Sequence, residues 1–148
     1  AQLRSGFPVL GNPGNKKKSV ALTKPQFRYG FGNALPEQES DALWDAHTIP
    51  SPGRPLFEAA FANFSGKSPA KVATDNNTRG PLLMISGKLD HTVPDVVTRA
   101  AYKLYGKSSA VTELKQYPDR GHSLTLDHGW IEVADDVLDW LDKQAAAA

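Results

Sequence analysis

The hydrophobic pattern is clearest in the C-terminal half of the chain, where it predicts strand, helix, strand and helix in that order. An apolar run over 81–86, bounded by glycines, is typical of a short strand buried on both faces. A helix is predicted over about 94–105, because proline suits a first helical turn and Gly106 can end the helix. A second strand over 111–117 and an amphipathic helix over about 131–143 complete the series.

The N-terminal half predicts three short helices after an irregular beginning. Prolines and glycines are too dense in roughly the first twenty residues for a regular element. A helix begins at the capping-box sequence 23–26, a second over about 36–47 opens with acidic residues, and a third covers about 55–64. Because these helices hold most of the phenylalanines, we expect them to pack on one another.

These elements divide the chain into four parts. Residues 1–64 form a helical region, and the polar segment 65–80 is a linker. Residues 81–144 form the strand–helix–strand–helix part, and the alanines of 145–148 form a disordered tail or a segment added by cloning.

Composition describes an ordinary globular domain. A chain of 148 residues is long enough to bury a hydrophobic core. Its residues are 40% hydrophobic and 22% charged. Lys and Arg number 17 against 16 Asp and Glu, so the net charge of +1 favours neither nucleic acid nor an anionic membrane as a partner. The lysine run 16–18 is interpreted as a solvated loop, with nucleic-acid contact as the weaker alternative.

No sequence window is apolar for the length of a membrane span, and no signal peptide opens the chain. These features favour a soluble, cytoplasmic protein. The absence of cysteine excludes disulfides, thiol catalysis and zinc–thiolate sites, and it leaves the cellular compartment open.

Two ionisable residues follow the two predicted strands. Asp90 lies in the loop after the first strand, and His122 lies in the loop after the second. Neighbouring parallel strands are only about 4.8 Å apart, so loops leaving the same end can bring the two side chains into contact. Taken singly, each could be an ordinary loop residue. Together they predict a carboxylate that orients a histidine acting as a general base.

The sequences Gly87-Lys88-Leu89-Asp90-His91-Thr92-Val93-Pro94 and Gly121-His122-Ser123 resemble the C-terminal part of an α/β-hydrolase of the esterase or lipase-like kind. The resemblance is most specific over 79–141, and 4–64 is similar to the helical cap that many such enzymes carry. It implies an α/β fold in which a helical cap precedes the last two parallel strands and helices of the sheet. It also implies that Asp90 is the triad acid, that His122 is the general base, and that no cofactor or metal is needed.

The nucleophile of that family is missing from this sequence. There is no G-x-S-x-G elbow, and the earlier strands and the oxyanion loop are also absent. The segment Gly66-Lys67-Ser68-Pro69-Ala70 is only superficially similar, because it follows a predicted helix instead of a strand. Ser86 and Ser123 lack the strand-to-helix turn that exposes a nucleophilic hydroxyl.

The remaining histidines have weaker claims to a role. His91 is interpreted as a loop residue, and His128 with the adjacent Asp127 does not give a recognisable metal site. His47 lies on a predicted helix beside proline-rich turns and is assigned no role.

Aromatic residues of the predicted cap helices have two interpretations. Ordinary core packing is the simpler one. The alternative is that some of them line a pocket for an apolar acyl or alkyl group, as the resemblance implies. The candidates for such a pocket are Phe27, Phe31, Trp44, Phe57 and Phe61.

Two strands are too few for a stable open sheet, and the strand over 81–86 would have a bare apolar edge. We therefore expect a partner at that edge, either the N-terminal half of the hydrolase as a separate chain or a second copy. The leading function is the C-terminal portion of a serine ester hydrolase acting on a small-molecule ester, with its serine on that missing segment. The alternatives are a non-catalytic interaction module that uses the sheet edge and cap, and proton abstraction without a serine.

Overall fold

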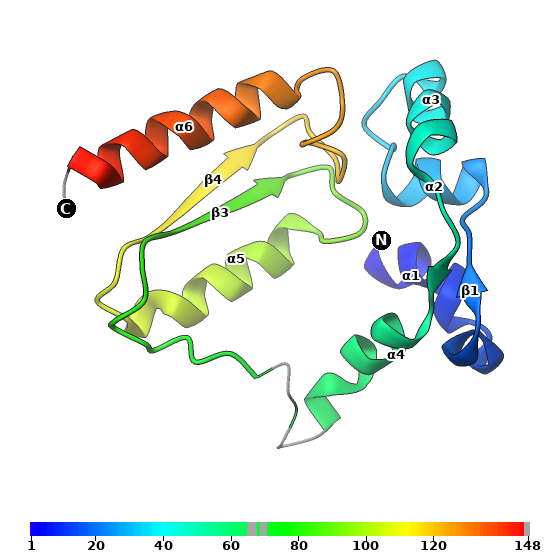
Figure 1. The fold of residues 1–148 in the computed structure, drawn as a ribbon, viewed down its shortest axis with the longest axis horizontal. Helices are drawn as coiled ribbons and strands as arrows, with labels where there is room; N and C mark the ends of the chain where they lie inside the picture. The colour runs from blue at the N-terminus through cyan, green and yellow to red at the C-terminus, as the bar shows by residue number, and fades with distance from the viewer. Residues whose placement is uncertain (65–67, 69–70, 147–148) are drawn as a thin grey trace.

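In the computed structural model, which describes residues 1–64, 68 and 71–146, helices and two small sheets form a mixed α/β structure (Figure 1). The helices α1 to α4 gather in one part of the molecule, and the strands β3 and β4 lie with α5 and α6 in the other. The structure therefore confirms the α/β class in its general form.

The second part is the predicted strand–helix–strand unit. Strand β3 (Leu82–Gly87) and strand β4 (Thr112–Tyr117) are parallel, with Leu82 opposite Thr112 and Gly87 opposite Tyr117. Helix α5 (Asp95–Leu104) and the short 3-10 turn η3 (Tyr105–Lys107) connect them. Both loops that follow the strands leave the same end of the sheet, because the strands run in the same direction.

Helix α6 (Trp130–Ala146) lies across the strands from α5 in Figure 1. It continues through Ala146, beyond the predicted end near residue 143. Its Val133 packs with Tyr117 and Leu124 in a small buried cluster, against which Ile85 of β3 also packs. The core of this part therefore lies under the start of α6, near the carboxyl ends of the strands.

The expectation that β3 is buried on both faces is wrong for this structure. Leu82, Leu83, Met84 and Ile85 are only half-buried, and burial becomes complete at Ser86 and Gly87. Strand β4 is the only strand of the described residues that pairs with β3. The other edge of β3 pairs with no strand of the described residues, and the apolar side chains of β3 keep partial contact with solvent.

The N-terminal part contains more helix than the sequence predicts. Its helices and 3-10 turns are α1 (Gln2–Leu10), η1 (Pro13–Lys17), α2 (Lys24–Gly30), α3 (Glu37–His47), α4 (Arg54–Phe61) and η2 (Ala62–Phe64). The three predicted helices correspond to α2, α3 and α4, and the last turn of the third is a 3-10 turn instead of α-helix.

Helix α1 corrects the expectation of an irregular beginning. It accommodates Pro8 in its interior, where proline removes one helical hydrogen bond. Tertiary contacts supply the compensation, because α1 packs against both α2 and α4. Local proline and glycine content was therefore a poor guide here, since packing often outweighs intrinsic helix propensity.

A two-residue antiparallel ladder in this part was not predicted. Strand β1 (Ser19–Val20) pairs with strand β2 (Ser51–Pro52), which lies in the proline-rich segment after α3. The next residue, Gly53, donates its N–H to the carbonyl of Lys18 at 3.0 Å. A Cβ at Gly53 would lie 2.3 Å from the carbonyl oxygen of Asn15, so this close approach requires glycine.

The predicted helices do not all pack on one another. Helices α2 and α3 pack together, and Arg28 of α2 forms ion pairs with Glu37 at 2.8 Å and Asp41 at 2.7 Å. Helix α4 instead packs mainly on α1 and η1. The N-terminal part is thus built from two helix pairs that α1 connects.

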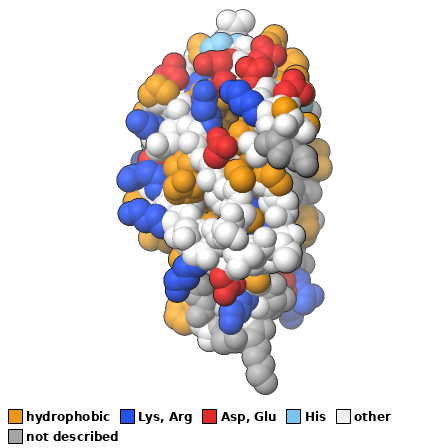
Figure 2. Space-filling model, turned by 90° about the vertical axis from the view of Figure 1, so that its left-hand side faces the viewer, with side chains coloured by type: hydrophobic (Ala, Val, Ile, Leu, Met, Phe, Trp, Pro, Cys, Tyr) orange, Lys and Arg blue, Asp and Glu red, His pale blue; other side chains and the backbone are white. Residues whose placement is uncertain are grey.

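The part of the linker that the structure describes forms hydrogen bonds with the strand–helix–strand unit. Ser108 donates its hydroxyl to the Asn76 carbonyl at 2.7 Å, and the Arg79 guanidinium donates to the Val111 carbonyl at 2.9 Å. Figure 2 shows a face with acidic and basic side chains and hydrophobic ones between them. None of the described helices has the length and apolar character needed to cross a bilayer.

Candidate active site

Asp90 and His122 are in direct contact, as the parallel pairing of their strands predicts. The Nδ1 atom of His122 lies 2.8 Å from Oδ2 of Asp90. An ionised carboxylate can only accept a hydrogen bond, so Nδ1 carries the proton and the neutral imidazole has its lone pair on Nε2. This is the tautomer that a general base needs.

The Asp90 carboxylate is held by its own loop. Its Oδ1 atom accepts the backbone N–H of Thr92 at 2.7 Å and of Val93 at 2.8 Å. Burial raises the pKa of Asp90, but the hydrogen bonds from His122 and from these two N–H groups outweigh burial and leave the pKa below its usual value. Asp90 is therefore ionised near neutral pH and oriented for His122.

His122 is held on one side and open on the other. Its side chain is 30% exposed, whereas that of Asp90 is 7% exposed. Within the described residues, Nε2 of His122 makes no hydrogen bond. The Phe31 ring contacts the imidazole edge to face, with ring centroids 4.8 Å apart. The free Nε2 atom can thus accept a proton from a group placed beside it.

A second carboxylate holds the ends of the two strands together. Asp95, in the first turn of α5, accepts hydrogen bonds from Gln116 at 2.6 Å and Ser86 at 2.9 Å. Arg99 lies 2.8 Å from its other oxygen. The hydrogen bond from Gln116 is the main reason that the pKa of Asp95 is lowered, with Ser86 and Arg99 adding to it against the opposing effect of burial. Asp95 is committed to these partners and has a structural role.

A buried ion pair shapes the histidine loop. The Arg120 guanidinium contacts the carboxylate of Asp127, and both side chains are almost fully buried. Arg120 also donates to the Gly129 carbonyl at 3.1 Å. A Cβ on Gly129 would collide with the guanidinium, so the loop closes tightly over Arg120. Sequence reasoning missed this pair, because nothing in the spacing of the two residues indicates burial.

The nearby serines are already occupied by other acceptors. Ser86 donates to Asp95, and Ser123 donates to the Phe31 carbonyl at 2.9 Å. Ser5 shares a hydrogen bond of 2.7 Å with Thr92. In the segment 66–70, residues other than Ser68 lie outside the described residues. Across the part of the chain that the structure describes, no serine hydroxyl is bonded to His122.

The five aromatic residues suggested as a substrate pocket are not gathered at one place. Phe31 touches His122, and Phe27 stacks on Phe31 with centroids 5.3 Å apart. Trp44 is half-buried and donates its Nε1–H to the Leu22 carbonyl at 2.6 Å.

Phe57 and Phe61 lie on α4, which packs mainly on α1 and η1. Phe57 is buried, whereas Phe61 is 60% exposed and lies against Phe64. Of the five, only Phe31, with Phe27 stacked on it, lies beside the Asp90–His122 pair.

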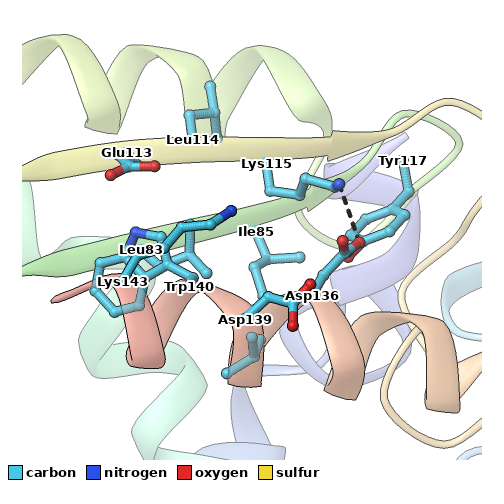
Figure 3. Close-up of a pocket in the computed structure, with 11 residues that line it drawn as sticks. Leu83, Ile85, Glu113, Leu114, Lys115, Tyr117, Asp136, Asp139, Trp140 and Lys143 are labelled. Carbon is cyan, nitrogen blue, oxygen red and sulfur yellow. Dashed lines mark hydrogen bonds and ion pairs between the residues drawn. The ribbon is translucent and has the colours of Figure 1, made fainter. Parts of the chain in front are cut away.

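A cavity of about 170 Å³ lies between the strands and α6 (Figure 3). Its wall includes Leu83, Lys115, Trp140 and Lys143, and it contains neither Asp90 nor His122. The cavity is therefore separate from the Asp90–His122 pair.

The other histidines have contacts that explain them. His91 donates from Nδ1 to the Tyr29 carbonyl at 2.9 Å, and His128 lies 2.8 Å from an oxygen of Glu39 on α3. Among the described residues, no group of three or more His, Cys, Asp or Glu side chains is arranged to hold a metal ion.

Several residues that support the pair were missed by sequence reasoning. They are Tyr29, Gly30, Asn33, Thr92 and Ser123, and each makes a contact between the N-terminal helices and one of the two loops. The last carbonyls of a helix have no helical hydrogen-bond partner. The predicted end of this helix was therefore the one sign in the sequence that other groups must bind there. The sequence did not indicate which groups would satisfy them.

Comparisons with known proteins give no relative for this chain. No family model matches the sequence, and neither the curated proteins nor the solved structures contain a match. The geometry of the Asp90–His122 pair is therefore the feature of the chain that points to a function.

Proposed function

We propose that this chain carries the acid and the general base of a serine ester hydrolase, with the nucleophilic serine on a missing N-terminal segment or on a partner chain that supplies that segment. The architecture would then be a helical cap followed by the last two strands of an α/β-hydrolase sheet. The substrate would be a small ester with an apolar acyl or alcohol group, and no cofactor would be required.

The observation that carries the proposal is the hydrogen bond of 2.8 Å between Asp90 and Nδ1 of His122, with Nε2 left free. In the proposed reaction, Nε2 accepts the proton of a serine hydroxyl as that oxygen attacks the ester carbonyl. The carboxylate of Asp90 stabilises the imidazolium that forms. The proton then passes to the leaving alcohol, so the histidine returns to its neutral form.

The uncovered edge of β3 supports a contribution from another polypeptide. Its apolar residues are half-exposed, whereas β4 alternates exposed and half-buried positions, as an outer strand does. A strand placed beside β3 would cover that edge and could carry the serine to the same end of the sheet.

The test is hydrolysis of p-nitrophenyl acetate by the purified chain, compared with His122→Gln and Asp90→Asn. We expect weak hydrolysis that His122→Gln lowers strongly, because the imidazole oriented by Asp90 can act as a base on an activated ester without a serine. Asp90→Asn should lower the rate of hydrolysis about ten- to a hundredfold, because it removes a hydrogen bond to a charged group, and that factor corresponds to the free energy of such a bond. The exposed His47 gives a matched control, His47→Gln, which should leave the rate unchanged.

A serine-directed fluorophosphonate with intact-mass analysis locates the nucleophile. An adduct on a co-purifying polypeptide would support the proposal. An adduct on a serine of this chain would contradict the placement of the nucleophile elsewhere. Hydrolysis that is the same in wild type and His122→Gln would contradict a catalytic role for the pair.

The second candidate is a non-catalytic interaction module. It is favoured by the same edge of β3, which presents apolar side chains and backbone groups that no described strand covers. Such a module would assemble without using His122. Sedimentation analysis distinguishes the two, because a module that pairs through β3 should form a complex that His122→Gln leaves intact and that shows no esterase activity.

A further inference from the structure

The carboxyl end of α2 touches both loops of the catalytic pair. The carbonyls of Tyr29, Gly30 and Phe31 follow one another at the end of the helix. The Phe27 carbonyl still accepts a helical hydrogen bond from Phe31, but these three lie among the last carbonyls of the helix, which have no helical partner. All three accept hydrogen bonds from side chains of the two loops.

The acid loop satisfies the first two carbonyls. His91 donates from Nδ1 to the Tyr29 carbonyl at 2.9 Å, and Thr92 donates its hydroxyl to the Gly30 carbonyl at 2.7 Å. The rings of Tyr29 and His91 also lie against each other at a tilt of 32°, with centroids 4.6 Å apart. These two donors directly follow Asp90, so the end of α2 restrains the backbone that presents the carboxylate.

The histidine loop satisfies the third carbonyl. Ser123, the residue after His122, is buried and donates its hydroxyl to the Phe31 carbonyl at 2.9 Å. The Phe31 ring meets the imidazole edge to face at 77°. Phe31 therefore contacts the histidine loop twice, once through its backbone and once through its ring.

The segment after α2 adds a further contact to each loop. Asn33 donates its side-chain N–H to the Leu89 carbonyl at 2.8 Å, just before Asp90. A Cβ on Gly121 would lie 3.2 Å from the Ala34 methyl, so that part of the histidine loop lies directly against this segment.

We propose that the end of α2, residues 29–34, positions the Asp90–His122 pair, and that Phe31 is its central positioning residue. One rigid turn of backbone fixes both loops, so the carboxylate and the imidazole keep their mutual distance. Phe31 contacts the imidazole ring edge to face and makes no hydrogen bond to it, so its effect is exerted through the position of His122. The inference rests on the proposed function only in treating the pair as catalytic.

This role differs from that of a pocket wall. A residue that lines a pocket changes which substrate binds, whereas a positioning residue changes the hydrogen bond between His122 and Asp90 without any substrate present. The second effect is measurable on the chain by itself.

The test is solution NMR of the His122 Nδ1–H proton in the uniformly ¹⁵N-labelled chain. Phe31→Ala removes the ring but keeps the backbone carbonyl. In the wild-type chain, the edge-to-face contact should slow exchange of the Nδ1–H proton about two- to tenfold. We therefore expect exchange with water to become faster by that factor. Phe31→Tyr keeps the ring and should restore slow exchange.

Phe64→Ala is the matched control, because Phe64 is 85% exposed and lies outside both loops. Ser123→Ala is the second test variant, since it removes only the hydrogen bond to the Phe31 carbonyl and should also speed exchange. Equal exchange rates in Phe31→Ala, Ser123→Ala and Phe64→Ala would overturn the proposal, whatever their thermal stabilities.

The same measurement separates this inference from the proposed function. Faster exchange in Phe31→Ala supports positioning even if the wild-type chain hydrolyses no ester, an outcome that would count against the ester hydrolase alone. His122-dependent hydrolysis with unchanged exchange would overturn the positioning role and leave the hydrolase proposal standing.

Discussion

The carboxyl ends of β3 and β4 are well packed, whereas the bodies of the same strands are half-exposed. Ser86, Gly87 and Tyr117 end the strands in buried positions, and the loops continue this burial at Asp90 and Arg120. The preceding residues of both strands remain partly open to solvent.

This difference shows where the structure is held together. The loops at the carboxyl ends pack against the N-terminal helices, which satisfy their polar groups, while the strand bodies have only α5, α6 and each other. The Asp90–His122 pair is thus held in place at one end of a sheet whose strand bodies are half-exposed. The contrast predicts that equivalent substitutions will have larger effects at the ends of the strands than along them.

The largest effect is expected when the buried ion pair of the histidine loop is broken. Arg120→Ala leaves Asp127 buried without its partner and should lower the free energy of unfolding by about 3–5 kcal/mol. Arg54→Ala removes an exposed pair with Glu58 on α4 and should lower the free energy of unfolding far less, because solvent screens an exposed ion pair. Urea denaturation measures both. Similar losses in the two variants would show that the loop is not a centre of stability.

Two leucines compare the loop with the strand directly. Leu124→Ala, in the buried cluster of the histidine loop, should lower the free energy of unfolding by about 2–5 kcal/mol. Leu83→Ala in the body of β3 should cost clearly less, because Leu83 already contacts solvent and water can enter the space. Chemical denaturation of both variants is the measurement. An equal or larger loss for Leu83→Ala would reverse the comparison.

A smaller effect is expected at the end of β4. Tyr117 donates its hydroxyl to Asp136 of α6 at 2.6 Å, and this hydrogen bond is the main cause of the lowered pKa of Asp136. Tyr117→Phe should cost about 1 kcal/mol, because water can partly replace the lost donor at this half-exposed carboxylate. Carboxyl NMR titration should show the pKa of Asp136 moving upward. An unchanged pKa would mean that Lys115, 3.0 Å away, is the dominant partner.

The smallest effect is expected in the pH dependence of stability. The pKa of Asp90 is lower in the folded chain than in the unfolded chain. The ionised carboxylate therefore stabilises the fold at pH values above its unfolded pKa of about 3.9. This stabilisation is lost as the pH falls through the pKa of the folded chain. Asp90→Asn should therefore flatten the loss of stability between neutral and acidic pH, measured by urea unfolding. Asp135→Asn, at an exposed position of α6, is the control and should leave that slope unchanged.

The sequence was sufficient for the elements that have strong local patterns. The apolar run of β3, the proline before α5 and the amphipathic α6 identified the strand–helix–strand–helix order, and parallel pairing followed from it. That pairing also predicted contact between Asp90 and His122. It did not predict α1, because proline and glycine lower helix propensity and the compensating contacts with α2 and α4 are remote in sequence.

The order and type of the C-terminal elements, and the nearness of the two ionisable residues, were thus determined by the sequence itself. Periodicity and turn residues act locally, so they can be recognised without the fold. The supports of the pair were decided only by the tertiary structure. The Phe31 carbonyl meets Ser123, and Arg120 meets Asp127, because separate segments pack together and each buried polar group then needs a partner. No local pattern specifies which partner that will be.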